Sequence, residues 1–438
     1  MRLAEYPPVR ARVPLVGTRP PAERPNGYLA DGPTFSVRPF NPMRRVRSAA
    51  VATLLTLAAL AAGCSPTTPP TVQSTSTTPP RTQPRLLTQP PLTSFLLLSS
   101  SFISSTTGWV FGESPCSAGR CFAMFATDDG ATTWSTVPPP PFAVSPTSYS
   151  FDSATIAFAN AEDGWAYDTS EQQVDGQTGD QLFSTHDGGS SWTAVSFPND
   201  DQSRIQTMAV GNGQVWMITF DTPPGSFPIY GSPVEYDDWT RSAFSFPLSA
   251  GPVTNFSITL QGDHGWIVEN DRGVITGASL EGTVWSAWTP PCSQPGSYDG
   301  ESVAAVSATY VVALCPPNLI VSKPPPTALY ASQNAGESFL LVATGNLLSA
   351  AANVAASPGG ALFAFDGPGI IASFDGGANW QTVVGFGSAT FPYADTFAPY
   401  SWITFVTSSI GFSMTPTGHL IMTSNGGQTW QSVGLPST

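Results

Sequence analysis

The segment Thr127–Trp134 reads TDDGATTW, and these residue types predict a tight hairpin turn. Asp129 can accept hydrogen bonds from backbone N–H groups of the turn, and Thr127 can close it with its hydroxyl. Gly130 supplies the positive φ that a tight turn demands. Trp134 can cover the turn with a large apolar face. The segment therefore predicts two antiparallel strands, one on each side of it.

The same octad recurs along the chain. Further copies occupy 185–192, 373–380 and 423–430, and a weaker one occupies 332–339. Segments 237–239 and 281–285 have the character of eroded copies. Since equivalent turns spread along a chain serve folding rather than one active centre, we predict a structural role for their shared positions. These are Thr127, Asp129, Trp134, Thr185, Asp187, Trp192, Ser332, Asn334, Phe339, Ser373, Asp375, Trp380, Thr423, Asn425 and Trp430.

A second signature precedes the first by roughly 20 residues. It consists of an apolar strand, a short polar turn and then Gly and an aromatic residue that start a second strand, and the middle copies are degenerate. The successive marker positions are separated by 56, 51, 50, 45, 51 and 50 residues, which gives seven copies of one unit. The markers are Trp109, Trp165, Trp216, Trp266, Val311, Leu362 and Phe412.

Each unit contains four strand-like runs of period two. In the last unit these runs are 402–407, 411–415, 419–423 and 429–433. One such four-stranded sheet cannot bury both of its faces, whereas seven sheets arranged radially cover one another. The sequence thus predicts an all-β fold, a single seven-bladed β-propeller of four-stranded antiparallel blades, over residues 93–438.

The octad resembles the Asp-box, Ser/Thr-x-Asp-x-Gly-x-Thr-Trp, of sialidase-like propellers. Together with the Gly-Trp strand, the pattern resembles the BNR-type repeats of photosystem II assembly factor-like proteins, over about 94–438. That resemblance implies a scaffold or assembly role. Sialidases grip the substrate carboxylate with an arginine triad, and bidentate Arg is needed for that grip. The globular part contains only Arg120, Arg204, Arg241 and Arg272, so we expect no sialidase activity.

The N-terminal part predicts export. Of the 16 basic residues, nine precede Cys64, so the chain from Cys64 onward carries 7 − 27 = −20 formal charges. Segment 43–63 has a cationic start, a short apolar core and small residues before Cys64, as in a lipoprotein signal peptide. Residues 61–64, Ala-Ala-Gly-Cys, resemble the lipobox of bacterial lipoproteins, which implies lipidation of Cys64 and a lipid-anchored, extracytoplasmic protein on the outer face of the bacterial cell membrane. Segment 64–92 is rich in Pro, Thr and Ser and predicts an extended, disordered tether.

Residues 1–42 have no apolar period, and we assign them no fold. Translation could start at Met1 or at Met43, and both remain open.

The four cysteines beyond Cys64 form an even number. Cys116 and Cys121 flank a four-residue loop that a disulfide could close, leaving Cys292 and Cys315 as the second candidate pair. Free buried thiols are the alternative interpretation.

The remaining chemistry is sparse. The net charge of −14 argues against a nucleic-acid partner. His186, His264 and His419 are isolated, and no metal-binding or phosphate-binding motif occurs, so we predict no metal and no cofactor. We assign no catalytic residue. We expect a monomeric, non-catalytic surface protein whose propeller binds a protein or a glycan. The tryptophans outside the repeat signatures, which could provide a platform for stacking a sugar ring, are Trp239, Trp285, Trp288 and Trp402. The alternative is a secreted glycoside hydrolase with a carboxylate pair in the central pocket.

Overall fold

The computed structural model describes residues 85–86, 95–117, 119–142, 154–168, 173–174, 177–178, 181–196, 204–220, 225–247, 255–271, 274–292, 301–317, 326–345, 353–366, 369–386, 402–415 and 418–436. These residues form strands and turns, and they fold as one unit, whose elements all lie beyond Pro79. None of them forms a helix of the length and apolar character that crossing a membrane requires. The predicted signal segment 43–63, Cys64 and most of the predicted tether lie outside the described residues.

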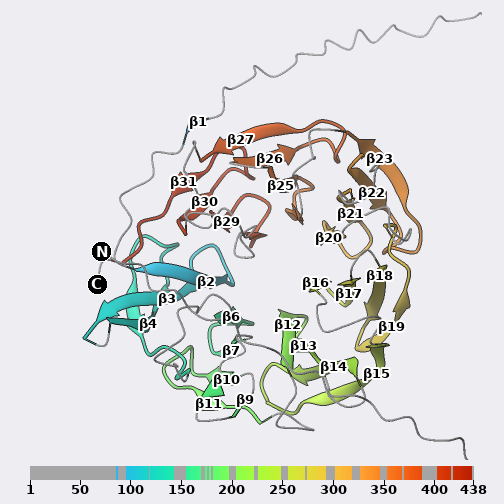
Figure 1. Cartoon of the computed structure of the whole chain (residues 1–438). Coiled ribbons are helices and arrows are strands. Elements are labelled where there is room, and N and C mark those ends of the chain that lie inside the picture. The colour runs from blue at the N-terminus through green and yellow to red at the C-terminus, as the bar shows by residue number, and fades with distance from the viewer. Residues whose placement is uncertain are drawn as a thin grey trace, which may run out of the picture. The chain divides into compact units, whose positions relative to one another are not determined.

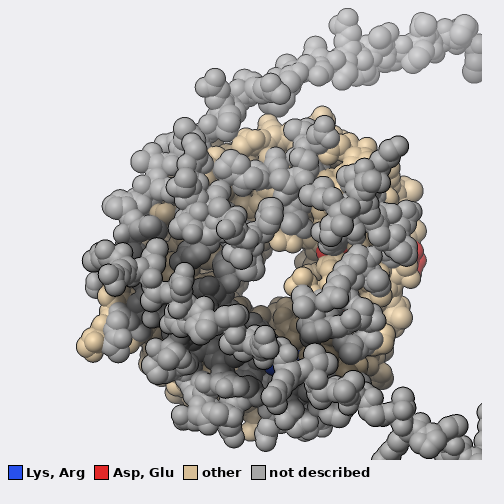
Figure 2. Space-filling model, viewed as in Figure 1, with Lys and Arg blue, Asp and Glu red and all other residues tan. Residues whose placement is uncertain are grey.

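Seven antiparallel four-stranded sheets are arranged as blades around a centre, which confirms the predicted seven-bladed propeller (Figure 1). Figure 2 shows an opening at the middle of this ring. In every blade the four strands follow one another in chain order from the inside outward. Blade 1 contains β2 (Leu96–Phe102), β3 (Gly108–Cys116), β4 (Gly119–Thr127) and β5 (Ser135–Val137), and blade 2 contains β6 (Ala154–Phe158), β7 (Asp163–Asp168), β10 (Gln181–His186) and β11 (Thr193–Ala194).

The other blades repeat the pattern. Blade 3 contains β12 (Arg204–Gly211), β13 (Gln214–Phe220), β14 (Ser226–Pro233) and β15 (Thr240–Pro247), and blade 4 contains β16 (Asn255–Gln261), β17 (His264–Asp271), β18 (Val274–Glu281) and β19 (Val284–Trp288). Blade 5 contains β20 (Ser302–Ala305), β21 (Val311–Cys315), β22 (Ala328–Ser332) and β23 (Leu340–Thr344), and blade 6 contains β24 (Val354–Ala356), β25 (Leu362–Asp366), β26 (Gly369–Ser373) and β27 (Gln381–Gly385). Blade 7 contains β28 (Ile403–Phe405), β29 (Gly411–Met414), β30 (Leu420–Thr423) and β31 (Gln431–Ser432), each strand shorter than the run predicted for it.

Two additions lie outside the seven-blade pattern. Strands β8 (Gln173–Val174) and β9 (Gln177–Thr178) form a small hairpin between the second and third strands of blade 2. Strand β1 (Arg85–Leu86) falls within the segment predicted as a tether and pairs in parallel with β27. Blade 6 therefore has a fifth strand on its outer edge.

The seven sequence markers lie in the second strand of their blades, and all are buried between sheets. A close approach explains the Gly that precedes several of them. The ring of Phe102 covers Gly108, where a Cβ atom would lie 2.2 Å from a ring carbon, and Phe158 covers Gly164 in the same way at 2.5 Å. A larger residue at either position would displace the aromatic ring that fills the space between strands.

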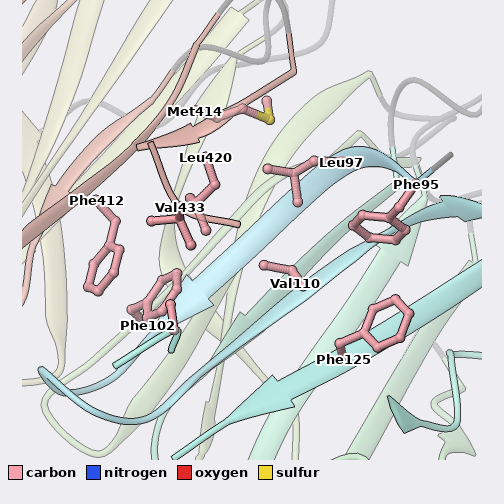
Figure 3. Close-up of a cluster of buried hydrophobic side chains, with 10 residues drawn as sticks. Phe95, Leu97, Phe102, Val110, Phe125, Phe412, Met414, Leu420 and Val433 are labelled. Carbon is pink, nitrogen blue, oxygen red and sulfur yellow. The ribbon is translucent and has the colours of Figure 1, made fainter. Parts of the chain in front are cut away.

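The ring closes by packing between its first and last blades, and each of these blades is built from one end of the chain (Figure 3). Phe102 of β2 stacks on Phe412 of β29, with ring centroids 3.6 Å apart. Phe95, Leu97, Met414 and other apolar side chains of the two blades complete this buried cluster. Among the described residues, blades 1 and 7 are each built from consecutive strands, and they meet through this apolar cluster and a hydrogen bond from the Trp134 indole N–H to the Gly434 carbonyl at 2.9 Å.

The propeller has two rims, which we name by their connections. The box rim carries the turns between first and second strands and between third and fourth strands. Backbone hydrogen bonds join the two kinds of turn, as from Gly130 N–H to the Thr106 carbonyl and from Gly188 N–H to the Glu162 carbonyl. The loop rim carries the connections from second to third strands and from one blade to the next.

Candidate functional site

The Asp-box turns of the box rim share one hydrogen-bond pattern. In the blade 2 turn, the Thr185 hydroxyl donates to Asp187 Oδ1 at 2.8 Å and accepts from Gly189 N–H at 2.9 Å. Asp187 also accepts from the Ser191 N–H at 2.8 Å and from the Ser191 hydroxyl at 2.6 Å. Every oxygen of the Asp187 carboxylate is thus engaged within its own turn.

The same contacts recur at the other four octads, centred on Asp129, Asn334, Asp375 and Asn425. Hydrogen bonds from the Thr133 side chain and backbone hold the pKa of Asp129 at about 2. Burial acts in the opposite direction on Asp375, but hydrogen bonds from Asn379 and Ser373 outweigh it, and its pKa is also lowered. Carboxylates held ionised as turn acceptors are poor general acids. This geometry supports the structural role proposed for the octads.

Tryptophan side chains connect the turns of neighbouring blades. The indole N–H of Trp109 in blade 1 donates to the carbonyl of Gly188 in the blade 2 turn at 3.1 Å. Trp266 in blade 4 donates to Ala335 in the blade 5 turn, also at 3.1 Å. The two sequence signatures are therefore parts of one contact between blades. The sequence spacing alone did not reveal this, because the donor and acceptor are about one and a half repeats apart.

Blade 2 and blade 3 are joined differently, by charged groups. His186 Nδ1 lies 2.7 Å from Asp163 Oδ1, and His186 Nε2 lies 3.4 Å from Asp237 Oδ2. Asp237 also accepts from Ser184 Oγ at 2.6 Å and from the indole N–H of Trp165 at 3.2 Å. Burial disfavours the charged imidazole, but the hydrogen bonds and charges of Asp163 and Asp237 outweigh it, so the pKa of His186 is raised.

This cluster lacks the arrangement of a Ser-His-Asp triad. Both ring nitrogens of His186 face carboxylates, and the Ser184 hydroxyl donates to Asp237 rather than to the imidazole. A triad requires the base to accept the proton of the nucleophile. Among the described residues, no group of three or more His, Cys, Asp or Glu side chains is placed to hold a metal ion. The cluster therefore fits a structural contact between blades.

A pocket of about 280 Å³ lies beside this cluster on the box rim. It is bordered by the turns between first and second strands of blades 1, 2 and 3. Phe102, Phe158 and Val210 give it apolar walls, and Asn160 and Asn212 add amide groups. The Asn160 side chain is committed to its own turn, since its Oδ1 accepts from the Asp163 N–H at 2.8 Å and its Nδ2 donates to Asp163. No pair of carboxylates lines this pocket.

The arginines of the globular part do not form a carboxylate grip in the part of the chain that the structure describes. Arg204 lies in β12, the innermost strand of blade 3, and Arg241 lies in β15, the outermost strand of the same blade. Strands three positions apart in a sheet are separated by about 14 Å. Arg120 belongs to β4 of blade 1, and Arg272 lies outside the described residues.

The tryptophans outside the repeat signatures are packed into the propeller. Trp239 and Trp285 are buried, and Trp288 donates its indole N–H to the Gly336 carbonyl at 2.9 Å. Trp402 packs against the cluster between blades 1 and 7. None of these four indoles is among the large exposed apolar side chains, so they do not provide an open platform for stacking a sugar ring.

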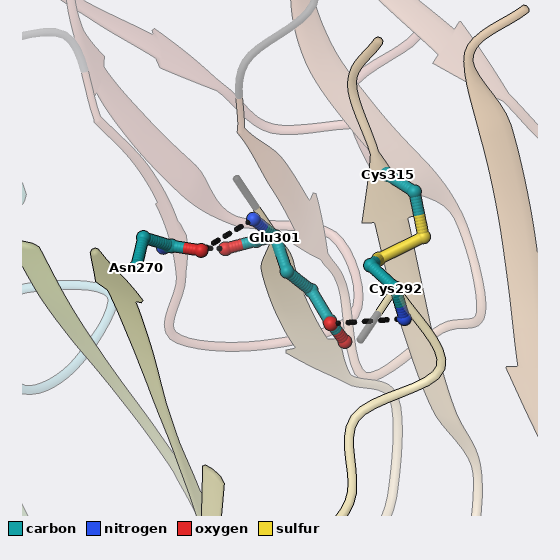
Figure 4. Close-up of a disulfide and its surroundings, with 4 residues drawn as sticks. All are labelled: Asn270, Cys292, Glu301 and Cys315. Atoms are coloured by element: carbon teal, nitrogen blue, oxygen red, sulfur yellow. Dashed lines mark hydrogen bonds between the residues drawn. A yellow bond between two sulfur atoms is a disulfide. The ribbon is translucent and has the colours of Figure 1, made fainter. Parts of the chain in front are cut away.

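The loop rim contains both disulfides. Cys116 bonds to Cys121 across the tip of the β3–β4 hairpin, and Cys292 bonds to Cys315 between blades 4 and 5. Beside the second disulfide, the Glu301 carboxyl accepts a hydrogen bond from the Cys292 N–H at 3.2 Å (Figure 4). Asn270 of blade 4 accepts from the Glu301 N–H at 2.8 Å, which fixes the start of blade 5 against blade 4.

Glu301 is a buried carboxyl that the sequence did not distinguish from the other acidic residues. Only 4% of its surface is exposed, and its Oε1 atom has no hydrogen-bond partner. Burial raises its pKa to about 8, against the opposing effect of the Cys292 N–H. The group is therefore protonated at neutral pH. Nothing in its local sequence signals this, because the burial comes from a neighbouring blade.

Exposed apolar side chains gather on the box rim, a feature that the repeat pattern also did not reveal. Tyr236, Val284, Leu340 and Phe374 lie in or beside the turns between third and fourth strands of blades 3, 4, 5 and 6 in succession, and each is at least 42% exposed. Acidic residues lie close to each in sequence, namely Glu235, Glu281, Glu337 and Asp375. We call this set of four turns the apolar arc.

Comparison with known proteins supports the fold and goes no further. No protein-family model matches the chain, and no curated protein matches it. The structure of YCF48 bound to D1 peptide is 19% identical, with 78% of this chain and 99% of that chain covered and a TM-score of 0.48. YCF48 from Cyanidioschyzon merolae is 15% identical over 77% and 95% of the two chains, with a TM-score of 0.46. An ancestral GH74 enzyme is 14% identical over 79% of this chain and 47% of its own, with a TM-score of 0.50.

Proposed function

We propose that this chain is a non-catalytic binding protein whose propeller holds another protein. The observation that carries the proposal is the apolar arc, which places exposed Tyr236, Val284, Leu340 and Phe374 on four successive blades. Large apolar side chains exposed on several neighbouring blades are a feature that interaction surfaces share. The structure of YCF48 holds a D1 peptide; for this chain the proposal rests on its own exposed residues.

A protein partner fits these residues better than a glycan. The unassigned tryptophans Trp239 and Trp285 are buried. Open aromatic faces for a sugar ring are therefore limited to Tyr236 and Phe374, which lie on blades 3 and 6 with the aliphatic Val284 and Leu340 on the blades between them. Hydrolysis of a glycan would need two available carboxyl groups about 5–10 Å apart. In the described part of the chain, the Asp-box carboxylates are bound within their turns, and Asp163 and Asp237 both contact His186.

We further propose that the protein is exported and lipid-anchored through Cys64, with 64–84 as a spacer. Disulfides persist in oxidising, extracytoplasmic compartments, and both cysteine pairs beyond Cys64 are bonded. Replacing Cys64 with Ala should release the protein from the membrane fraction while the propeller stays folded. Full membrane retention of Cys64→Ala would contradict the anchor.

The binding function is tested by chemical cross-linking in the native cell, followed by identification of adducts. We expect a reproducible adduct with one protein, lost when Tyr236 and Phe374 are both replaced by Ser. As a control, Leu96, a large exposed apolar residue at the start of β2, is replaced by Ser. Release of reducing ends from polysaccharides by the purified protein, without any protein adduct, would instead establish the hydrolase.

A further inference from the structure

The outer edge of blade 5 is an unusual strand. Strand β23 (Leu340–Thr344) is the last strand of its sheet, so its outer backbone edge pairs with no other described strand. Figure 1 shows it on the periphery of the ring. Its first three residues, Leu340, Leu341 and Val342, are 78%, 55% and 37% exposed. The strand contains no charge, Pro or Gly.

The other outer strands have the protection that natural sheets give to their edges, which are short or carry charges or Pro. Strands β5, β11 and β31 have only two or three residues. Strand β15 carries Arg241 and ends at Pro247, and β19 begins three residues after Glu281 and buries Trp285. The edge of β27 is already occupied by β1. Strand β19 is as long as β23 and also lacks charge, Pro and Gly, but among the described outer strands β23 alone exposes three successive large apolar side chains beside an unpaired edge.

The pairing of β1 with β27 shows what an added strand on this side of the ring can be. The backbone of Arg85 pairs with Val384 and that of Leu86 with Gly385, in parallel. The added strand is thus an extended segment in which a basic residue and an apolar residue are adjacent. It lies on the outer edge of blade 6, next to blade 5.

The surroundings of β23 favour a basic partner. Apart from Arg85 of the added strand β1, the described residues of blades 5 and 6 contain no Lys, Arg or His, while Glu337 lies exposed three residues before Leu340. The chain from Cys64 onward carries −20 formal charges, so a second copy of the protein would be repelled and a cationic segment attracted.

We propose that the outer edge of β23 binds an extended segment of a partner protein by strand addition, with apolar residues alternating with Lys or Arg in that segment. Backbone hydrogen bonds along the edge provide the affinity in this mode, and alternate side chains provide the specificity. The apolar side chains of the partner pack either beside Leu341 or beside the pair Leu340 and Val342. Its basic side chains face the acidic surface around Glu337. This proposal rests on the proposed protein-binding function and assigns it to one edge.

The test uses the full-length protein and a fluorescent synthetic peptide of alternating Arg and Val, with binding followed by anisotropy. Leu341→Lys places a charge on the edge, and Leu96→Lys makes the same charge change at an exposed position on blade 1, outside the apolar arc. We expect Leu341→Lys to weaken binding by roughly tenfold or more and Leu96→Lys by less than about twofold. Equal weakening by both variants, or no binding by the wild type, would overturn the proposal.

Two N-methylated peptides test for backbone pairing, because each blocks the N–H groups along one edge of the extended peptide. We expect one version to lose binding and the other to keep it. If both bind as the parent does, strand addition is wrong. If the wild type sediments as a dimer that Leu341→Lys dissociates, the occupant is a second copy, and a partner segment is ruled out.

The two proposals can fail separately. A cellular adduct that survives Leu341→Lys but is lost when Tyr236 and Phe374 are replaced would keep the binding function and reject β23 as its site. If the wild-type protein forms no adduct at all, both proposals are rejected.

Discussion

The box rim and the loop rim are built from the same strands but obey different constraints. On the box rim, five turns repeat one set of contacts, from the Thr127 hydroxyl in blade 1 to the Thr423 hydroxyl in blade 7. On the loop rim, connections differ in length from blade to blade, and the disulfides and Glu301 occur once each. The repeated turn contacts of the box rim join neighbouring blades, whereas the loop rim carries features that do not repeat from blade to blade.

The largest expected effect tests the rigidity of the box rim. Gly427 has a φ of +82°, and a Cβ atom there would lie 2.2 Å from the ring of Phe363 in blade 6. Replacing Gly427 with Ala should lower the free energy of unfolding by about 3–5 kcal/mol, since both backbone strain and overpacking result. Denaturant unfolding measures this. Gly434→Ala is the matched control, because nothing lies within 4 Å of its added Cβ. Similar losses in both variants would refute the close packing of the turn.

The next effect tests the loop rim through Glu301. Its folded-state pKa is raised to about 8 from an ordinary value of 4.5, so the unfolded chain ionises first as pH rises. The folded state then binds more protons than the unfolded state between these values, and stability falls across that window. We expect the wild type to lose several kcal/mol more than Glu301→Gln between pH 5 and pH 8, measured by denaturant unfolding. The comparison with Glu301→Gln removes the contribution of His186, whose pKa is also raised. Identical pH profiles would show that Glu301 is not buried as a neutral acid.

The two disulfides provide a comparison within the loop rim. Cys292 and Cys315 are 23 residues apart, while Cys116 and Cys121 are 5 apart. Because closing a longer loop removes more chain entropy, replacing the first pair with Ser should cost about 3.5 kcal/mol and the second about 2 kcal/mol. Calorimetry or denaturant unfolding of the two double variants distinguishes them. A larger loss from the shorter loop would indicate that local contacts outweigh chain entropy.

The smallest effect is a gain in stability on the box rim. Ala131 occupies a turn position with a φ of 64°, where the corresponding residues of blades 2, 6 and 7 are glycines. Replacing Ala131 with Gly should relieve backbone strain and stabilise the fold by about 0.5–1 kcal/mol. Thermal unfolding would detect this shift. A loss of stability would mean that the Ala131 methyl group, which lies in a buried cluster, contributes more than the strain costs.

The sequence predicted the propeller because its fold depends on repetition. Seven markers at nearly constant spacing and five octads are enough to specify blade number and strand order. Local turn chemistry also follows from residue type, as at Asp187 and Gly189. The contacts between blades could not be read in this way, because Trp109 meets Gly188 and His186 meets Asp237 only after the ring has formed. Burial of Glu301 and exposure of Leu340 likewise depend on which neighbouring element covers each residue. An apolar strand has the same local sequence pattern whether it is covered by a neighbour or exposed at the edge of a sheet.

The most direct test of the binding function is site-specific photo-cross-linking in the native cell. A photoreactive amino acid replaces Leu341 in one variant and Leu96, an exposed apolar residue near the loop rim, in another. We predict one discrete protein adduct from position 341 and none from position 96. Absence of any adduct from position 341, with polysaccharide cleavage by the same purified protein, would contradict the account.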